Sequence, residues 1–596
     1  MNVGLKLEAI RALMSELRWD AVLIGGSDPH GSEYTIKRWN LREYVTGFSG
    51  SAGTVVVTHS HAGLWTDSRY FIQAQNELAE TGVEVHRQSV NDSLDWPEWL
   101  SENLPNDCII GIDGLCVSQL EKRKLEKRLF DKRCHIDSKP DFIDTIWKDR
   151  PGLPMGMVRE HNNTYSGRTV AQKLSWLRQV LESADCSYFP VNRLDQIAWL
   201  LNIRCNDIQY NPVPISYVLV GYDIAVLFID FRKVDDDIRA KLENDGVSIM
   251  PYQEVFSHFE TLDSKKRILV DDSSINSELF KVVENHFGAE NMVLEQSPLL
   301  LEKSIKNNTE REGFRKAYIL DGVAETRFFY WLDKKMKSGE RVTEIDASMM
   351  MEIIRKENSD YICQSFNTIS AYADNAAMPH YSPMAGMEAE LKPQGLYLVD
   401  SGAHYLFGTT DITRTIPLGP LTRIEREDYT HALKGMIALS TAVFPKGTPG
   451  CRLDSIARIP LWRVYRDYGH GTGHGVGNVL CVHEGPQSFR QDLNDQPFVE
   501  GMITSCEPGI YREGSHGIRH ENMLLCIDAG KNDFGDWLCF ETLTMVYLET
   551  APLLPELLNF EESVWINSYN ELVCERLSPY LSEKEAVWLK NKTKPI

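Results

Sequence analysis

Five residues in the C-terminal half of the chain combine types and spacing that suit chemistry. They are Asp400, Asp411, His474, Glu507 and Glu521. Asp400 ends a short apolar run, and Asp411 follows after a length of chain that lets two paired strands bring both carboxylates together. His474 lies in a glycine-rich loop, and each glutamate lies in a short turn-like segment.

Together these residues offer four carboxylates and one imidazole, a hard and oxygen-rich donor set. Such a set indicates a site for manganese or another divalent metal, and not a closed zinc site with thiolate ligands. Because packed carboxylates raise one another's pKa, four of them need cations to stay ionised. Two divalent ions about 3.5–4 Å apart would neutralise them and activate a bridging hydroxide for attack on a polarised carbonyl. The residue types therefore predict metal-assisted hydrolysis.

Each position also has a structural explanation when taken alone. An aspartate at a strand end is often a turn former, and a single glutamate can be a satisfied structural acid. The loop 470–475 is different, because its glycines let backbone approach a bound group closely and two histidines accompany them. Those glycines alternate and do not form a dinucleotide fingerprint, and Gln487 breaks the zinc-protease pattern that begins at His483.

The elements that must position these residues are short apolar strands, broken by glycine and proline, over residues 360–530. Two helices are predicted before them, and Thr343 with Asp346 forms a capping box for the second. Further upstream, the succession of helix and strands occurs twice, on either side of a proline- and glycine-rich linker near 150–165, and predicts two copies of one α/β module. The predicted helices span 6–18, 121–133, 169–183, 193–202, 312–336 and 343–356, and the predicted upstream strands span 21–24, 54–58, 188–191, 215–220 and 224–230.

Composition sets the surrounding expectations. A length of 596 residues predicts about four modules. The net charge of −22 would repel nucleic acid and anionic lipid, so neither is expected as a partner. There is no apolar run long enough for a membrane span, and charge near the N-terminus argues against a signal peptide. The 12 cysteines form no C-x-x-C pair, so we expect a cytoplasmic protein whose cysteines act as small buried hydrophobes.

In their order and spacing these segments resemble the pita-bread metallopeptidases, and specifically the long, three-domain form of aminopeptidase P (Xaa-Pro aminopeptidase). Residues 32–34, 46–54 and 64–71 resemble the creatinase-like N-terminal domain of that family. The resemblance implies a fold of mixed α/β and α+β class. It implies creatinase-like domains at 1–155 and 160–304, a pita-bread catalytic domain at 305–532 and a C-terminal extension with dimer contacts at 533–596.

The resemblance also implies a role for each site residue. Asp411 and Glu521 would bridge two divalent metal ions, which we expect to be Mn2+. Asp400 would complete one metal site, and His474 and Glu507 the other, with Glu507 as general base.

Five further residues receive roles around the metals. His380 would contact the substrate, His483 would stabilise the oxyanion, and His470 would transfer a proton near the proline side. Arg69 would bind the substrate, and Arg519 would hold a ligand carboxylate in place. Ser68 and Cys506 depart from the family pattern without removing a ligand.

Three functions follow as hypotheses. The first is an aminopeptidase that releases the N-terminal residue from peptides with proline at position two. The second is a prolidase that cleaves only Xaa-Pro dipeptides, and the third is a metal-free binding protein, which the retention of all five ligands disfavours. A homodimer is expected from the apolar stretch 537–558 and from the helix after Ile566.

Overall fold

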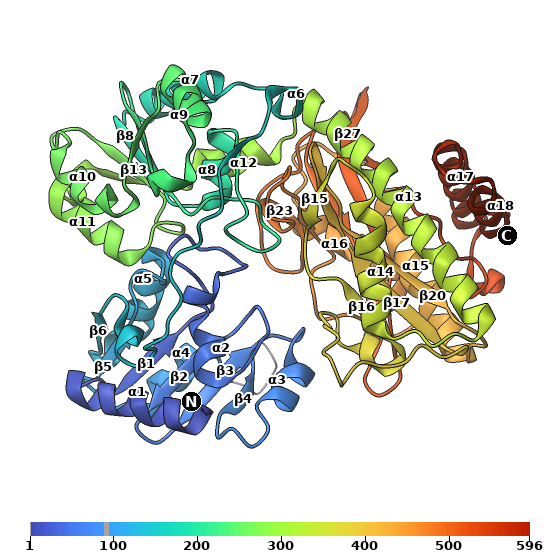
Figure 1. Ribbon diagram of the computed structural model, residues 1–596, viewed down its shortest axis with the longest axis horizontal. Helices are drawn as coiled ribbons and strands as arrows, with labels where there is room; N and C mark the ends of the chain where they lie inside the picture. Colours follow the sequence, from blue (N-terminus) through green and yellow to red (C-terminus); the bar gives the residue numbers. More distant parts are fainter. Residues whose placement is uncertain (1, 89–93) are drawn as a thin grey trace. The chain divides into compact units, whose positions relative to one another are not determined.

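A computed structural model describes residues 2–88 and 94–596 (Figure 1). The chain divides into two compact units. The first comprises Met1–Asn163 and Arg168–Leu300, and the second comprises Thr164–Gly167 and Leu301–Ile596. Among the described residues, no helix combines the length and the apolar character that a membrane crossing requires.

The first unit begins with an α/β module built around a six-stranded sheet. Its helix α1 (Val3–Leu17) starts at Asn2, whose side chain accepts a hydrogen bond from the Leu5 amide, and it buries Ile10 and Met14 against the sheet. The sheet order is β4-β3-β2-β1-β5-β6. Its strands are β1 (Ala21–Ile24), β2 (Thr54–Thr58), β3 (Ala62–Thr66), β4 (Glu84–Arg87), β5 (Ile109–Ile112) and β6 (His135–Ser138). Its other helices are η1 (Lys37–Trp39), α2 (Leu41–Thr46), α3 (Phe71–Glu77), α4 (Trp96–Asn103), α5 (Gln119–Arg128), η2 (Phe130–Lys132) and η3 (Phe142–Thr145).

A second six-stranded sheet in the same unit repeats the first in both order and strand direction. Its order is β12-β11-β10-β8-β13-β14. In each sheet, the second, third and fourth strands in this order pair antiparallel: β3, β2 and β1 in the first sheet, and β11, β10 and β8 in the second. The other three pairings of each sheet are parallel. The predicted duplication of one α/β module is therefore confirmed. The strands are β8 (Tyr188–Val191), β10 (Tyr217–Gly221), β11 (Ala225–Phe228), β12 (Ser248–Met250), β13 (Ile268–Val270) and β14 (Met292–Leu294), and the short pair β7 (Arg159–Glu160) and β9 (Ile203–Arg204) lies apart from them.

Helices accompany this second sheet as the hydrophobic periodicity predicts. Helix α7 (Val170–Ser183) starts at a capping box in which Thr169 and Gln172 satisfy each other's backbone amides. The remaining helices are α8 (Leu194–Leu200), η4 (Phe231–Lys233), α9 (Asp236–Asn244), η5 (Tyr252–Glu254), α10 (Val255–His258), η6 (Phe259–Thr261), α11 (Ser277–Phe287) and η7 (Ala289–Asn291).

The second unit has a long helix, α13 (Asn308–Ser338), packed beside α14 (Glu344–Lys356). The capping box of Thr343 and Asp346 at the start of α14 is confirmed. Both helices contribute to one large apolar core, shared with the strands that carry the predicted ligands. Further helices of this unit are η8 (Ala373–Ala377), α15 (Arg423–Ser440) and α16 (Gly450–Trp462), and the helices α6 (Asn163–Ser166) and α12 (Pro298–Ser304) each begin in the first unit and end in the second.

The strands of the second unit form two main sheets and two small ones. The main orders are β16-β17-β20 and β21-β28-β27-β24-β22-β23, and the small ones are β15-β18-β19 and β25-β26. The strands are β15 (Tyr361–Gln364), β16 (Ile369–Tyr372), β17 (Leu396–Ser401), β18 (Ala403–Tyr405), β19 (Gly408–Thr409), β20 (Ile412–Pro417), β21 (Phe444–Pro445), β22 (Gly473–Gly475), β23 (Glu484–Phe489), β24 (Ile503–Cys506), β25 (Gly509–Arg512), β26 (His516–Arg519), β27 (Asn522–Asn532) and β28 (Gly535–Thr542).

The C-terminal segment packs onto the second unit itself. Helix α17 (Phe560–Leu577) buries Ile566 and Val573 in the large core, and Trp588 of α18 (Glu583–Lys592) donates to Asp333 of α13 at 3.1 Å. Residues of the apolar stretch 537–558 are buried in the same core, so that stretch does not by itself indicate a dimer. The short helices η9 (Pro555–Leu557) and η10 (Ser578–Tyr580) flank α17.

One cysteine pair departs from the expectation of isolated thiols. Cys108 and Cys134 are joined by a disulfide, with their Cα atoms 4.6 Å apart. They precede β5 and β6, two neighbouring parallel strands, so the sheet places them side by side although 26 residues separate them. The other ten cysteines are free.

Candidate metal centre

Strand ends of the second unit carry the five predicted ligands. Asp400 lies near the end of β17 opposite Thr413 of β20, and Asp411 immediately precedes β20. The predicted pairing of two strands that bear these aspartates is therefore confirmed. His474 is the central residue of β22, Glu507 directly follows β24, and Glu521 directly precedes β27.

The five side chains converge. His474 Nε2 lies 3.4 Å from Asp411 Oδ2 and 3.6 Å from Glu507 Oε1. One ligand atom each from Asp411, His474 and Glu521 lie within 4.8 Å of one another. Asp400 is close enough for the Asp411 charge to raise its pKa. The two aspartates and Glu521 are buried, whereas His474 and Glu507 are partly accessible.

Two carboxylate oxygens at the centre lack a protein partner. Asp400 Oδ1 and Glu521 Oε1 are buried and accept no hydrogen bond from the residues that the structure describes. Leaving a charged acceptor unsatisfied costs about 1–3 kcal/mol or more, so a buried pair of this kind needs an external partner. A divalent cation would supply it, and the donor set of four carboxylates and one imidazole fits hard divalent metals.

Electrostatics at the centre also point to cations. Burial raises the pKa of Asp400 to about 6 and that of Glu507 to about 7, and it raises the pKa of Glu521 well above its usual range. Burial lowers the pKa of His474, but the contact with Asp411 and the charge of Glu507 outweigh it and raise that pKa to about 9. Without metal ions, Glu507, Glu521 and His474 would therefore hold protons near neutral pH, and Asp400 would hold one below about pH 6.

Metal binding is expected to release protons, and affinity is expected to rise with pH. Metal ions must displace the protons held by Asp400, Glu507 and His474. The carboxyl pKa values are raised in the folded state, so protonation stabilises the metal-free fold at low pH, and that contribution disappears as the pH rises through about 7. Titration calorimetry with Mn2+ in buffers of different ionisation enthalpy measures the released protons. An affinity that stays constant between about pH 5 and 8 would contradict this prediction.

Arg519 connects the centre to one of the predicted histidines. Its Nη2 donates to Asp400 Oδ2 at 2.6 Å, and its Nη1 donates to the Tyr511 hydroxyl at 2.8 Å. That hydroxyl lies 2.8 Å from His470 Nε2. Arg519 Nε donates to the Thr413 hydroxyl, which in turn donates to Glu521 Oε2 at 2.8 Å. One guanidinium thus orients ligands on two different strands, and Tyr511 and Thr413 were not among the predicted residues.

The orientation of His474 is set by its neighbours on β22 and β24. Its Nδ1 lies 2.9 Å from the Gly475 carbonyl oxygen, which leaves Nε2 to face the carboxylates. Its amide donates to the Ser505 hydroxyl at 3.0 Å. A Cβ at Gly473 would lie 1.8 Å from the Ser505 carbonyl oxygen. The glycines of this loop therefore allow neighbouring strands to approach, and not only a bound group as the sequence indicated.

The other predicted histidines occupy different places. The His483 ring packs edge-on against His474, with centroids 4.3 Å apart. Its neighbour Glu484 is buried and bonded at 2.5 Å by both Lys303 and Lys306, which fixes the start of β23. His380 lies in the turn after η8, the short helix that packs on β26.

Arg69 belongs to the first unit. It forms a two-pronged ion pair with Asp67, at 2.8 Å from Nε and 2.7 Å from Nη2.

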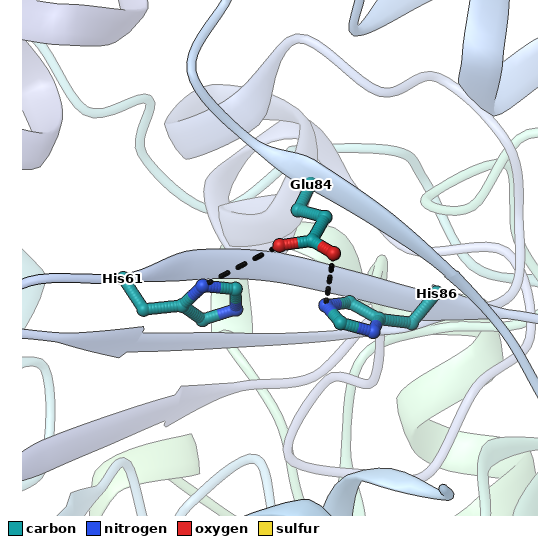
Figure 2. Close-up of side chains that lie close together, drawn as sticks. All are labelled: His61, Glu84 and His86. Carbon is teal, nitrogen blue, oxygen red and sulfur yellow. Dashed lines mark ion pairs between the residues drawn. The ribbon is translucent and has the colours of Figure 1, made fainter. Parts of the chain in front are cut away.

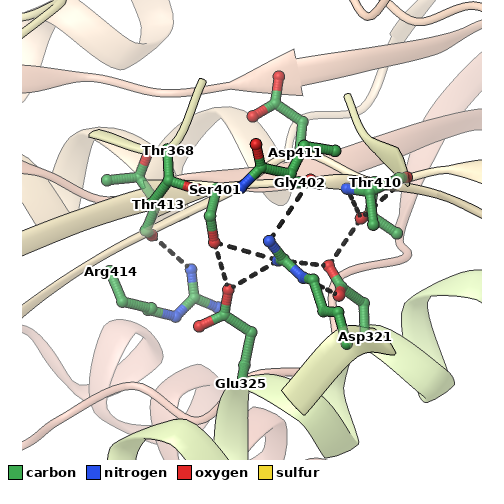
Figure 3. Close-up of polar contacts among 12 residues, drawn as sticks. Asp321, Glu325, Thr368, Ser401, Gly402, Thr410, Asp411, Thr413 and Arg414 are labelled. Atoms are coloured by element: carbon green, nitrogen blue, oxygen red, sulfur yellow. Dashed lines mark hydrogen bonds and ion pairs between the residues drawn. The ribbon is translucent and has the colours of Figure 1, made fainter. Parts of the chain in front are cut away.

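A buried charge network lies behind the aspartate strands (Figure 3). Arg355 of α14 pairs with Asp321 at 2.7 Å and with Glu325 at 3.1 Å, both on α13. Arg355 also donates to Ser401, the residue after Asp400, and Thr410, the residue before Asp411, donates to Asp321 at 2.6 Å. The Asp411 carboxylate points away from this network. The network therefore holds the backbone on which both aspartates are mounted.

Arg414 of β20 holds the backbone of the segment that carries Glu521. It donates to the Glu521 carbonyl oxygen at 2.5 Å and to the Tyr569 hydroxyl of α17 at 2.9 Å. Arg414 is fully buried, and the Tyr569 hydroxyl, which has one proton to donate, lies 2.9 Å from the carbonyl oxygens of both Thr544 and Val546 in the segment between β28 and α17. The C-terminal helix is thus tied directly to a ligand-bearing segment.

Known families account for nearly the whole chain. Residues 6–144 and 149–310 match creatinase/prolidase N-terminal domains. Residues 312–528 match metallopeptidase family M24, and residues 536–596 match the C-terminal region of peptidase M24. The fold is therefore that of a pita-bread metallopeptidase with two creatinase-like N-terminal domains, as the sequence predicted.

Three relatives match along their full length. The chain is 38% identical to a probable Xaa-Pro aminopeptidase P of Paracoccidioides brasiliensis (strain Pb18), with 100% of both chains covered, and 36% identical to aminopeptidase P1 of Arabidopsis thaliana, with 99% of each covered. It matches the crystal structure of X-prolyl aminopeptidase from Caenorhabditis elegans, a cytosolic enzyme with a di-nuclear active site, with a TM-score of 0.96, 34% identity and 100% of both chains covered. The chain belongs to the Xaa-Pro aminopeptidase P family of M24 metallopeptidases and is a metal-dependent aminopeptidase.

Proposed function

We propose that the chain releases the N-terminal residue from peptides that carry proline at position two. The observation that carries the proposal is the buried cluster of four carboxylates and one imidazole, with two unpaired carboxylate oxygens, in a chain that matches Xaa-Pro aminopeptidases from end to end. An Xaa-Pro amide lacks the N–H that other peptide bonds offer, so a site that accepts the pyrrolidine ring is a distinct specialisation.

The proposed ligands are the five convergent residues. Asp411 and Glu521 would serve both divalent ions, Asp400 would complete one site, and His474 and Glu507 would complete the other, as the proximity of these side chains supports. The hard, oxygen-rich donor set supports manganese as the metal. When bound, two such ions polarise the scissile carbonyl and lower the pKa of water.

The chain's own residues then bind the peptide and move protons. Glu507 accepts the proton of the attacking water, and it lies at the accessible side of the centre beside His474. His483 donates to the oxyanion, and its packing on the His474 ring beside the metal ligands supports this role. His470 is oriented by Tyr511 for proton transfer on the proline side, and His380 and Arg69 bind substrate. Asp67 supports the role of Arg69 by fixing the direction of its guanidinium.

Products from matched peptides test the proposal. The protein loaded with Mn2+ is incubated with an Xaa-Pro-Xaa tripeptide, with its alanine analogue at position two, with its N-acetylated form and with an Xaa-Pro dipeptide, and the products are identified by mass spectrometry. We expect release of the first residue from the free proline tripeptide, and neither the alanine nor the acetylated peptide as an efficient substrate. Cleavage of the dipeptide alone would identify a prolidase. No cleavage, with no bound metal by elemental analysis, would identify a binding protein.

Further assignments accompany this proposal. The proposed domain limits are 1–155, 160–304, 305–532 and 533–596. The proposed active form is a homodimer that is located in the cytoplasm and acts on peptides. Phe560 at the start of α17 is 82% exposed and Val587 of α18 is 57% exposed, which supports the C-terminal helices as the dimer contact. The cytosolic C. elegans relative supports the location. In a reducing compartment Cys108 and Cys134 would be thiols. Analytical ultracentrifugation tests the dimer.

A further inference from the structure

Two groups of three metal-ligating side chains occur among the described residues. One belongs to the metal centre, and the other consists of His61, Glu84 and His86 in the first unit, with one ligand atom from each within 4.8 Å of the others (Figure 2). We propose that these three residues bind a divalent metal ion of the zinc type, at a site separate from the catalytic centre.

The distances leave a gap that a metal ion would fill. His61 Nδ1 lies 3.7 Å from Glu84 Oε2, and His86 Nε2 lies 3.9 Å from Glu84 Oε1. Both are too long for a hydrogen bond. They are close to the separations of 3.4 and 3.6 Å between His474 and the carboxylates of the metal centre. Ligands about 2.0–2.1 Å from one zinc ion lie only slightly closer together, so small side-chain movements complete the site.

His86 Nε2 supplies an independent indication. This nitrogen is buried and has no hydrogen-bond partner, yet it faces the Glu84 carboxylate (Figure 2). A buried ring nitrogen without a partner is costly, and a bound ion removes that cost. The Glu84 side chain is 65% exposed, so solvent reaches the site and can supply a further ligand.

Neighbouring strands hold the three residues in place. Glu84 and His86 alternate by two on β4 and therefore share a face, and His61 immediately precedes β3, the parallel neighbour. Gly63 of β3 lies opposite Glu84, and a Cβ there would come within 2.6 Å of His61 Nε2 and 2.9 Å of His86 Cδ2. A glycine inside a strand weakens it, and here it provides the room that the two rings occupy.

Aromatic packing fixes the rings but leaves the carboxylate unexplained. The His86 ring stacks on Trp65 with centroids 3.9 Å apart and planes 3° apart, and the His61 ring lies 4.5 Å from that of Trp99. These contacts hold both imidazoles before any ion binds, which lowers the entropic cost of binding. They do not account for an exposed glutamate whose two oxygens face the two imidazoles at 3.7 and 3.9 Å.

The donor set specifies the class of metal. Two imidazoles and one carboxylate suit zinc and similar borderline ions, whereas the catalytic centre, with four carboxylates and one imidazole, suits harder ions. The proposed site and the catalytic centre therefore differ in the class of metal ion that they prefer. Zinc bound between β3 and β4 would also hold the edge strand β4 to its neighbour β3.

Zinc stoichiometry tests the proposal without reference to activity. The full-length chain carrying Asp411→Asn and Glu521→Gln, which remove catalytic ligands, is dialysed against buffered micromolar zinc, and bound zinc is measured by elemental analysis. We expect one zinc ion per chain. Adding His86→Ala or Glu84→Gln should weaken zinc binding at least about tenfold. Adding His135→Ala, an exposed histidine on the opposite edge strand β6, should leave it unchanged.

Two outcomes would overturn the proposal. One is the absence of bound zinc from the doubly substituted chain. The other is zinc bound equally well after His86→Ala and after Glu84→Gln. Because Glu84 is mostly exposed, Glu84→Gln leaves packing intact and decides the matter even if His86→Ala disturbs the fold.

Discussion

Replacing His474 with alanine is expected to lower kcat/KM on an Xaa-Pro-Xaa tripeptide by about 10³-fold or more, because it removes the imidazole that lies between Asp411 and Glu507. The fold should survive, since the His474 side chain is partly accessible and the tightly packed glycines on either side of it are unchanged. Steady-state kinetics at saturating Mn2+, with circular dichroism of the same samples, measure both effects.

His431→Ala is the matched control for this variant. His431 lies on α15 of the same unit and contacts none of the five proposed ligands, so its loss should change kcat/KM by less than about tenfold. Full activity in His474→Ala would rule out the ligand role of His474. A variant with low activity that recovers at high Mn2+ concentration would show that weakened metal binding is the cause.

The second large effect is expected on stability. Arg355→Met should destabilise the second unit by about 3–5 kcal/mol, because it leaves the carboxylates of Asp321 and Glu325 buried without their cation. Burial already raises the pKa of Glu325 to about 7 with Arg355 in place. Peptide-resolved hydrogen exchange measures the loss as faster exchange in α13 and β17, and it does not require the whole chain to unfold in one step.

Two comparisons separate this charge effect from a loss of packing. Arg327→Met, on the helix α13 that carries Asp321 and Glu325, breaks ion pairs with partly exposed partners and should cost less than about 1 kcal/mol. Combining Arg355→Met with Asp321→Asn and Glu325→Gln removes all three charges and should recover part of the protection. If the triple variant exchanges as fast as the single one, the ion pairs are not what stabilises this region.

Structural features could be predicted from the sequence where one short segment contains all the residues that determine them. The boundaries of α7 and α14 follow from apolar periodicity, and the start of α14 follows also from the predicted capping box of Thr343 and Asp346. The duplicated module could be predicted because both copies use the same succession of elements. His474 stands out for a similar reason, since a glycine-rich loop with two histidines is unusual, whereas Glu521 taken alone could be a structural acid.

The supporting residues could not be predicted, because each acts across a long separation in sequence. Tyr511 connects Arg519 to His470, and Arg414 reaches Tyr569, but neither tyrosine differs from an ordinary core residue in its own segment. Asp321 carried a weak signal, as a charge on the helix 312–336 predicted to bury one face. The pairing of Asp321 with Arg355 could not be predicted, because it depends on the packing of α13 on α14.

Three interpretations changed for physical reasons. Gly473 makes room for the Ser505 carbonyl of a neighbouring strand, where the sequence indicated a bound group. The apolar stretch after Trp537 completes the core of the chain's own second unit, where the sequence indicated a dimer contact. Cys108 and Cys134 are not isolated, because parallel strand pairing places residues 26 apart side by side.

The link from Arg414 to Tyr569 has a consequence for biosynthesis. A ribosome makes the strand that bears Arg414 long before it makes helix α17, and domains fold as units while synthesis continues. Until Tyr569 has left the ribosome, the buried guanidinium lacks one of its acceptors and the segment that ends in Glu521 is not fully anchored. We therefore expect the segment that carries Glu521 to become fully anchored only after helix α17 has been synthesised.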